Sequence, residues 1–250
     1  QWSAQTNKDW IQLSRSSGTV NQEERVYVSV DWKNIPVGDD LKGSISISGN
    51  GQTKKVLVSA INPEYPERSD VEGLFMEDNG YIVIEPEHFH RKYEDDTVSL
   101  VEMRNFGHTG SSMISIPPVA PSYNSFRKEQ TPALEYDFYT HHSGKFEVVT
   151  YTLPAFPLNK NRGTQFGISV NDEPIRYGNA GEPEEWKGDW ANNVLRNSSM
   201  NRTIHTIEKP GKHTLKFWVE DPGIALQKIV IDFGGLNQSY MGPGETRMVD

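Results

Sequence analysis

Short runs of alternating polar and apolar residues, broken by turn residues, restrict the fold of this chain more than any other feature. The clearest run is 25–32, which would place Val26, Val28, Val30 and Trp32 on one side. Side chains alternate between the two faces of a β-strand, so this pattern predicts a strand with one buried face. Similar runs recur along the chain, and no convincing amphipathic helix longer than about two turns is predicted. The sequence therefore predicts an all-β fold.

The distribution of these runs predicts two domains in the 250 residues. Residues 1–62 hold about four or five strand candidates, including a hairpin at Asn50-Gly51, and predict an immunoglobulin-like β-sandwich. The proline-containing stretch 63–70 predicts a linker. Residues 71–250 hold about eight or nine further strand candidates and predict a larger β-sandwich.

Charge and cysteine content exclude several classes of function. The formal net charge is −9, with acidic and basic residues scattered along the chain, which argues against nucleic acid or an anionic membrane surface as partner. Without cysteine the chain has no disulfides, no thiolate metal site and no cysteine nucleophile. No apolar run has the length of a membrane-spanning helix, and no signal peptide is recognised.

A pair of carboxylates follows the predicted strand 81–84. Glu85 and Glu87 are two residues apart, which in an extended segment places both on one face. Two like charges side by side repel each other, so a compensating group is expected. A hard cation with oxygen ligands would supply it, and calcium is the ion we expect. The alternative is that both carboxylates are solvated on an edge strand.

The loop 184–193 is the best candidate for a ligand-binding site. A sugar ring can stack on an indole while amides bind its hydroxyl groups. The residues of this loop that supply both kinds of group are Trp186, Trp190, Asn192 and Asn193. The alternative is that the tryptophans pack against another domain. Arg104, in a second polar loop, could bind the carboxylate of a uronic acid.

Catalytic motifs are absent from the sequence. It contains no Gly-x-Ser-x-Gly elbow, phosphate-binding loop or zinc-protease motif. The spacing of His88, His90 and Glu94 matches part of a cupin metal motif, but the expected glycines are misplaced. We therefore expect the chain to be non-catalytic by itself. A carbohydrate-active lyase or esterase built on a β-sandwich is the alternative.

Five motifs in one order give a family resemblance. They lie at 81–89, 134–138, 210–215, 221–232 and 239–243. Together they resemble the C-terminal domain of glycoside hydrolase family 115, the xylan α-1,2-glucuronidases. Residues 1–62 more loosely resemble the BACON-type modules of Bacteroidetes glycan-degrading proteins. The resemblance implies a jelly-roll, galactose-binding-like sandwich similar to carbohydrate-binding modules of families 6 and 35.

The resemblance also implies a site and a role. Modules of families 6 and 35 hold a structural calcium near a Glu-x-Glu pair with a late Asp, which implies Glu85, Glu87 and Asp232 here, although Pro86 departs from the usual pattern. It further implies binding of glucuronoxylan or its oligosaccharides, support of an upstream catalytic domain, and a homodimer. The protein would be bacterial and exported, either periplasmic, at the cell surface or secreted. A purely structural module without glycan affinity is the alternative.

Overall fold

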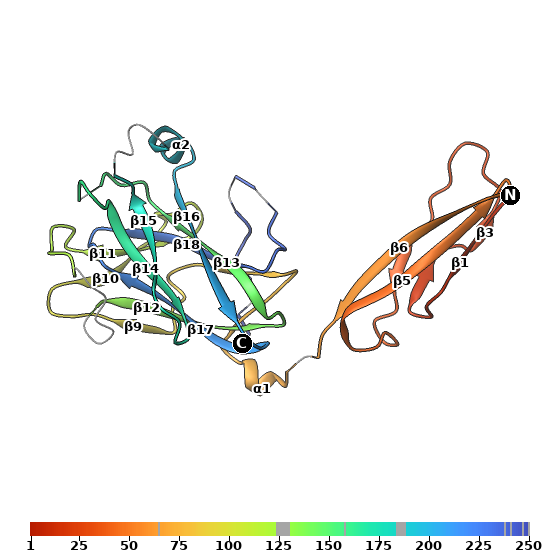
Figure 1. Cartoon of the computed structure of the whole chain (residues 1–250), viewed down its shortest axis with the longest axis horizontal. Helices are drawn as coiled ribbons and strands as arrows, with labels where there is room; N and C mark the ends of the chain where they lie inside the picture. The colour runs from red at the N-terminus through yellow and green to blue at the C-terminus, as the bar shows by residue number, and fades with distance from the viewer. Residues whose placement is uncertain are drawn as a thin grey trace. The chain divides into compact units, whose positions relative to one another are not determined.

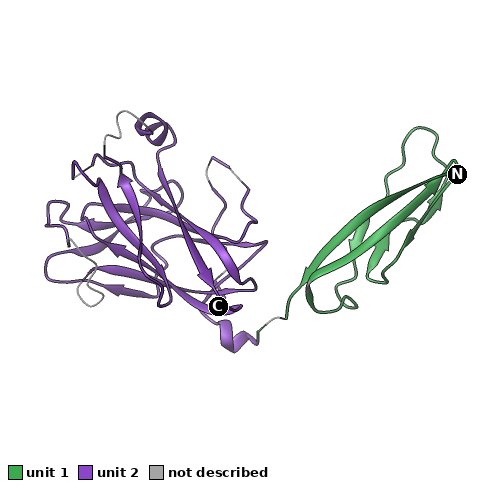
Figure 2. Cartoon of the chain, in the orientation of Figure 1, with its two compact units in different colours: residues 1–66 green, residues 67–250 purple. Residues whose placement is uncertain are grey.

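The computed structural model describes residues 1–250 except 65, 124–130, 158, 184–188, 238, 241, 247 and 250. The chain forms two compact units, Gln1–Pro66 and Glu67–Asp250 (Figure 2). The division falls within the predicted linker 63–70, although helix α1 (Arg68–Val71) already begins inside that stretch. Most regular structure is β-strand, so the all-β prediction is confirmed.

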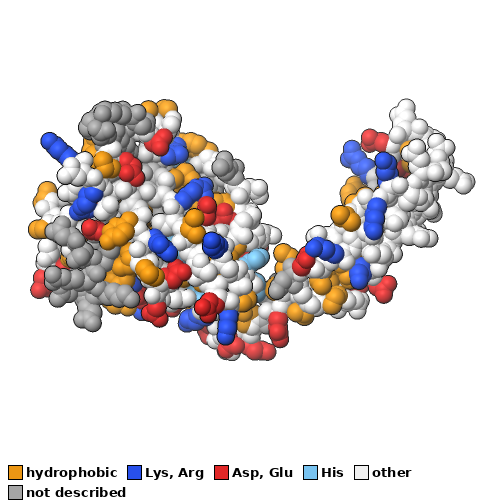
Figure 3. All heavy atoms as spheres, viewed as in Figure 1, with side chains coloured by type: hydrophobic (Ala, Val, Ile, Leu, Met, Phe, Trp, Pro, Cys, Tyr) orange, Lys and Arg blue, Asp and Glu red, His pale blue; other side chains and the backbone are white. Residues whose placement is uncertain are grey.

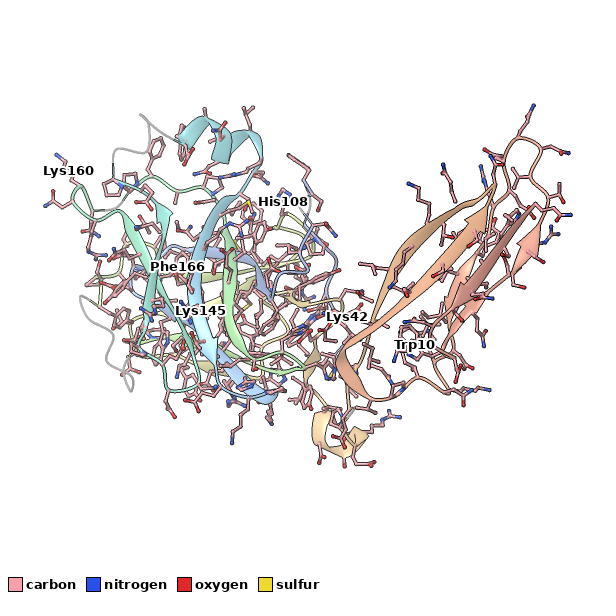
Figure 4. The ribbon with its side chains drawn as sticks, turned by 45° about the vertical axis from the view of Figure 1, so that its right-hand side comes forward. Trp10, Lys42, His108, Lys145, Lys160 and Phe166 are labelled. Carbon is pink, nitrogen blue, oxygen red and sulfur yellow. The ribbon has the colours of Figure 1, made fainter. Side chains whose placement is uncertain are left out.

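Two sheets form unit 1 (residues 1–66). The larger is antiparallel, with the order β3 (Ser17–Gly18), β1 (Trp2–Thr6), β5 (Gly38–Gly49) and β6 (Gln52–Asn62). The smaller pairs β2 (Ile11–Leu13) with β4 (Val28–Val30). The small core between them includes Trp10, Ile11 and Ile45 (Figure 4 labels Trp10). Asn50 and Gly51 have φ values of 52° and 73°, as a two-residue hairpin loop requires.

The predicted strand 25–32 is shorter in the structure. Only Val28–Val30 form β4, and Trp32 is 62% exposed rather than part of a buried face. The Asp31 carboxylate accepts hydrogen bonds from the Lys33 backbone N–H and the Asn34 amide. This Asx turn bends the chain directly after β4 and turns Trp32 away from the strand.

Unit 2 (residues 67–250) is a sandwich of two sheets (Figure 1). The first sheet has the order β10 (Ser99–Met103), β11 (Ser112–Ile116), β18 (Ala225–Asp232), β13 (Gly144–Thr152) and β16 (Ser199–Ile207), and β8 (Tyr81–Ile84) also pairs with β18. The second has the order β15 (Arg176–Gly181), β14 (Thr164–Val170), β17 (Gly211–Val219), β12 (Ala133–Thr140) and β7 (Phe75–Met76), and β9 (Arg91–Tyr93) also pairs with β12. Helix α2 spans Trp190–Leu195.

Alternating side chains of both sheets fill the core of unit 2. On β12 the inward set is Leu134, Tyr136 and Phe138, all fully buried, as their spacing in the sequence predicts. Phe166 lies between the sheets (Figure 4). Each large apolar side chain buried in this way contributes about 1.5–3 kcal/mol. The Tyr136 hydroxyl keeps a partner by donating to the Pro86 carbonyl at 2.9 Å.

The C-terminal segment after β18 covers the outer face of the first sheet. A second cluster of buried residues, Val83, Val149, Tyr151 and Val230, packs there against Leu236. The Thr246 hydroxyl binds the backbone of Val83, and Val249 exchanges backbone hydrogen bonds with Gly73 and Leu74. These contacts hold the segment against the sheet. Among the described helices, none has the length and apolar character needed to cross a membrane.

Candidate functional site

The loop end of unit 2 carries the candidate site. Here β13 ends and β16 and β18 begin, as the pairs Thr152–Ser199 and Thr152–Leu226 show. Helix α2, which precedes β16, stands at this end (Figure 1). The loop between β10 and β11 and the segment after β18 also reach it, because His108 binds Tyr240 and Tyr240 binds Leu195. Segments distant in the sequence therefore meet here.

The carboxylates of Glu85 and Glu87 converge at this end. They lie in a turn that follows β8, not on an extended segment as the spacing predicts. Both face Gly110: a Cβ added to Gly110 would lie 3.1 Å from Glu87 Oε1 and 3.2 Å from Glu85 Oε2. Gly110 also has a φ of 60°, which glycine adopts without strain. A glycine thus leaves room for two like charges to approach each other.

The hydrogen bonds around this pair are incomplete. Glu85 Oε1 accepts from the Thr109 hydroxyl at 2.7 Å and lies 3.3 Å from Lys228 Nζ. Glu87 Oε1 accepts from the Ser111 N–H at 3.0 Å. The second oxygen of each carboxylate, Oε2, is buried without a partner among the described residues. Burial, together with the neighbouring Glu87 charge, raises the pKa of Glu85, although Thr109 and Lys228 oppose that shift.

These oxygens fit a hard cation, but the ligand set implied by the family resemblance is not assembled. Two buried, unpaired carboxylate oxygens are the ligand type that calcium prefers. Asp232 does not join these ligands. It pairs with Tyr81, and Tyr81 lies four residues before Glu85, about 13 Å along the strand. Its Oδ1 instead accepts hydrogen bonds from the N–H groups of Gly234 and Leu236. Within the described ranges, no three His, Asp or Glu side chains gather closely enough to hold a metal.

An exposed aromatic stack lies beside α2. The rings of Phe156 and Trp190 stack with centroids 4.3 Å apart and an interplanar angle of 24°. Phe156 is 64% exposed, whereas Trp190 is only partly exposed, so Phe156 presents the accessible ring. Phe156 is not among the predicted contacts, although its place between two prolines in a strand-free stretch was a signal. Trp186, the other predicted contact, lies outside the described residues.

The two predicted asparagines of α2 differ in their surroundings. Asn192 is exposed on the helix and accessible to a ligand. Asn193 is buried, and its Oδ1 accepts a hydrogen bond from the Arg196 guanidinium, which also donates to the Ser198 carbonyl at 2.9 Å. Asn193 therefore anchors α2 to the start of β16. The predicted Arg104 is exposed and 3.6 Å from Glu102, and no described contact joins it to the aromatic residues.

A second aromatic group lies at the C-terminal end of α2, where Leu195 is the last helical residue. Tyr240 is 67% exposed, and its hydroxyl donates to the Leu195 carbonyl at 3.3 Å. His108 Nε2 donates to the Tyr240 carbonyl at 2.8 Å, and the two rings are 5.4 Å apart (Figure 4 labels His108). His108 precedes Thr109, the hydroxyl partner of Glu85, so one loop connects the carboxylate pair to this aromatic group. Tyr240 is not among the predicted site residues, because no local pattern places it beside α2.

The partial cupin motif does not form a metal site. His88 Nδ1 lies 2.9 Å from Glu245, and His90 Nε2 donates to the Gly73 carbonyl. Glu94 accepts a hydrogen bond from the Leu100 N–H. Each of the three side chains thus has a separate partner.

A buried ion pair holds the loops of the same end. The Asp221 carboxylate is fully buried. It accepts hydrogen bonds from both terminal nitrogens of Arg162, at 2.6 and 2.8 Å. It also accepts from the Gln165 N–H at 2.6 Å. Asp221 begins the Asp-Pro-Gly turn that leads into β18, and Gly223 has a φ of 86°. This pair therefore links the entry to β14 with the entry to β18.

Comparisons with known proteins give a family match and several similar solved structures. The glycosyl hydrolase family 115 C-terminal domain matches residues 74–245. One similar solved structure is a family GH115 4-O-methyl-α-glucuronidase with specificity for decorated arabinogalactans. Its sequence identity to this chain is 14% and the TM-score is 0.47. The match covers 70% of this chain and 19% of that one. No curated protein matches the chain.

Isolated sugar-binding modules are also among the similar structures. The C-terminal family 6 module of a marine laminarinase from Zobellia galactanivorans has 11% identity and a TM-score of 0.39, covering 61% of this chain and 98% of that one. A family 35 carbohydrate-binding module from Clostridium thermocellum has 17% identity and a TM-score of 0.37, covering 60% and 97%.

Proposed function

Because the chain belongs to the glycosyl hydrolase family 115 C-terminal domain family over residues 74–245, we propose that unit 2 is a non-catalytic module that binds a plant polysaccharide at the end bearing α2. The observation that carries this proposal is the stack of an exposed Phe156 on Trp190. A large exposed ring is costly in water unless a partner covers it. A pyranose ring can cover it with its C–H face.

The groups around the stack suit a sugar. Asn192 is exposed on α2, two residues after Trp190, and its amide can donate hydrogen bonds to hydroxyl groups and accept them. Tyr240 offers a second exposed ring at the C-terminal end of the helix. The ligand we propose is glucuronoxylan or one of its oligosaccharides, as the family resemblance implies. The parent protein would be an exported bacterial protein, periplasmic or at the cell surface, with an upstream catalytic domain.

We also propose a structural calcium ion at Glu85 and Glu87. Its support is the pair of buried, unpaired Oε2 atoms, since Lys228 supplies one positive charge for two carboxylates. The ion would fix the loop 105–111 through Thr109 and Ser111, and with it the position of His108 beside Tyr240. Its role is to order the binding end, and no chemical step is assigned to it.

A supporting role without glycan affinity is the second candidate. Leu195 and Tyr240 are exposed next to each other, and such apolar groups also suit packing against a neighbouring domain. In this alternative the unit would hold the catalytic domain and take part in a dimer. The two candidates differ in whether the isolated chain binds a glycan.

Isothermal titration calorimetry of the chain with glucuronoxylan oligosaccharides tests the proposal. We expect saturable binding that Phe156→Ala weakens at least about tenfold, because the sugar loses its stacking surface. Tyr27→Ala is the matched control, since Tyr27 is a similarly exposed aromatic residue of unit 1. Unchanged affinity in Phe156→Ala would contradict the assigned surface. Absence of binding by the folded, calcium-loaded chain would leave the supporting role.

A further inference from the structure

Strands β15 and β16 meet along one side of unit 2. Each is the last strand of its own sheet, β15 of the second sheet and β16 of the first. The two strands pack against each other although they belong to different sheets (Figure 1). We call this contact between Arg176–Gly181 and Ser199–Ile207 the seam. The outer edge of a sheet presents backbone N–H and C=O groups that need partners, so the contacts across the seam matter for its stability.

Two asparagines close the seam at the end nearer α2. The Asn201 side chain accepts a hydrogen bond from the Asn179 N–H at 2.8 Å and donates one to the Asn179 carbonyl. One amide on β16 thus satisfies both edge groups of a residue on β15. Because an amide side chain does not titrate, this contact does not depend on pH.

A glutamate and a histidine close the other end of the seam. Glu173 lies in the turn between β14 and β15, and its Oε1 accepts a hydrogen bond from the Thr206 N–H on β16 at 2.9 Å. Its Oε2 lies 3.0 Å from Nδ1 of His205, also on β16. One carboxylate therefore binds two neighbouring residues of the edge strand. Unlike the asparagine contact, this one contains an imidazole, which can take up a proton near neutral pH.

The surroundings of His205 favour the neutral ring. Its side chain is 0% exposed and packs against Phe146, with ring centroids 5.8 Å apart. Because a carboxylate only accepts, Nδ1 carries the proton, and Nε2 accepts a hydrogen bond from the Thr203 hydroxyl at 2.9 Å. A second proton, on Nε2, would have to reverse this hydrogen bond and would place a charge against an apolar ring.

The charged groups that act on His205 come from the turn before β15 and from β15 itself. Burial lowers the pKa of His205, contact with Glu173 opposes this shift, and the Arg176 charge adds to it. Figure 3 shows other acidic and basic side chains interspersed over the surface of unit 2, where solvent screens them. In an opened seam the ring would meet water and titrate at about 6.5. The open state thus takes up a proton at a higher pH than the closed state.

We propose that the seam is a pH-sensitive closure, which stays shut while His205 is neutral and opens when the ring is protonated. The contribution of His205 to closure is complete above about pH 6.5 and is lost as the pH falls, because the open state then binds one more proton.

This closure would also regulate the candidate site. The chain between β15 and β16 carries α2 with Trp190, so an open seam would loosen the base of that helix. Only this consequence rests on the proposed function. The seam itself is measured without a glycan, so either proposal can fail while the other stands.

Hydrogen exchange of the 250-residue chain, followed by mass spectrometry between about pH 7.5 and about pH 5.5, tests the closure. After correction for intrinsic exchange, we expect the opening equilibrium of amides in β15 and β16 to rise by up to about tenfold per pH unit below about 6.5. Strand β18, inside the first sheet, is the internal reference and should change little. Equal protection of the seam at both pH values would overturn the proposal.

Three variants separate titration from simple weakening of the seam. His205→Gln keeps a side-chain donor for Glu173 but cannot take up a proton, so its seam should open equally at both pH values. Asn201→Ala should open the seam by the same factor at every pH, because the amide contact does not titrate. His213→Gln, on β17 in the middle of the second sheet, is the matched control and should keep the pH dependence. A pH dependence retained in His205→Gln would rule out His205 as the switch.

Nuclear magnetic resonance of the unaltered protein gives a second measurement that needs no substitution. We expect the His205 ring to keep its neutral Nδ1–H form at about pH 6.5, where an exposed imidazole is half protonated. Titration of His205 at about 6.5 or above in the folded chain would contradict the closure.

Discussion

Lys228 and Glu85 form an ion pair at 3.3 Å beneath the C-terminal segment, and the Lys228 side chain is only 1% exposed. They face each other because β8 and β18 pair antiparallel, with Ile84 opposite Ile229. Lys228 also donates to the Pro243 carbonyl at 2.9 Å, so the same ammonium group binds the segment that covers it. One buried cation thus holds both a carboxylate and the covering segment at this end of unit 2.

Replacing Lys228 with methionine should destabilise the protein strongly. The change leaves the Glu85 carboxylate buried without the ammonium group, and loss of one partner of a buried ion pair costs about 3–5 kcal/mol. Urea unfolding followed by circular dichroism would measure the loss. Lys145→Met, at an exposed lysine labelled in Figure 4, serves as the control and should change stability little. Similar stabilities of the two variants would show that Lys228 does not hold the carboxylates.

Calcium should raise the thermal stability of the protein. Binding to the folded state alone stabilises it by RT ln(1 + [L]/Kd), so excess calcium increases the melting temperature and a chelator reverses the increase. Glu87→Gln should reduce this shift, because it removes a charge and one of the two unpaired Oε2 atoms. Glu208→Gln, at an exposed glutamate, should keep the full shift. A melting temperature independent of calcium would contradict the metal site and leave Lys228 as the cation that compensates Glu85.

Asp221→Asn should destabilise unit 2 by about 2 kcal/mol or more. The substitution removes the negative charge that pairs with Arg162. It also weakens the hydrogen bond that the Gln165 N–H donates to this side chain. The value is below the full range for buried pairs because the Arg162 side chain is 28% exposed. Chemical denaturation would measure it, with Asp172→Asn in an exposed turn as control. A loss equal to that of the control would show that this pair does not hold the loops.

Acid stability should depend on Asp137. Burial alone would raise its pKa, but hydrogen bonds from Arg91 and Thr214 outweigh burial and lower the pKa of Asp137 to about 2. In an unfolded chain the value is about 3.9, so this group stabilises the fold fully above that pH and loses its contribution as the pH falls towards 2. Asp137→Asn should therefore lower the urea concentration at the unfolding midpoint at neutral pH. The midpoint of this variant should also decrease less than that of the unchanged protein as the pH falls from about 3.9 to about 2. Parallel pH dependences of the two proteins would contradict the Arg91 contact.

Local patterns of the sequence determined the fold class and the positions of most strands. The alternation of Leu134, Tyr136 and Phe138 predicts the buried face of β12 because side chains of a strand alternate with a period of two. The Asn50-Gly51 hairpin follows equally from backbone preferences of two adjacent residues. The Glu85–Glu87 pair was also visible, since its members are neighbours in the chain.

Only the tertiary structure decided what surrounds those residues. Phe156 meets Trp190 and Glu85 meets Lys228 across long stretches of chain, because strands and loops distant in sequence come together at one end of the sandwich. Asp232 was expected beside the carboxylate pair, but the register of β8 and β18 places it opposite Tyr81. Residue type and spacing report local conformation, whereas a binding site is made by strand register and loop packing, and these depend on contacts that no short stretch of sequence contains.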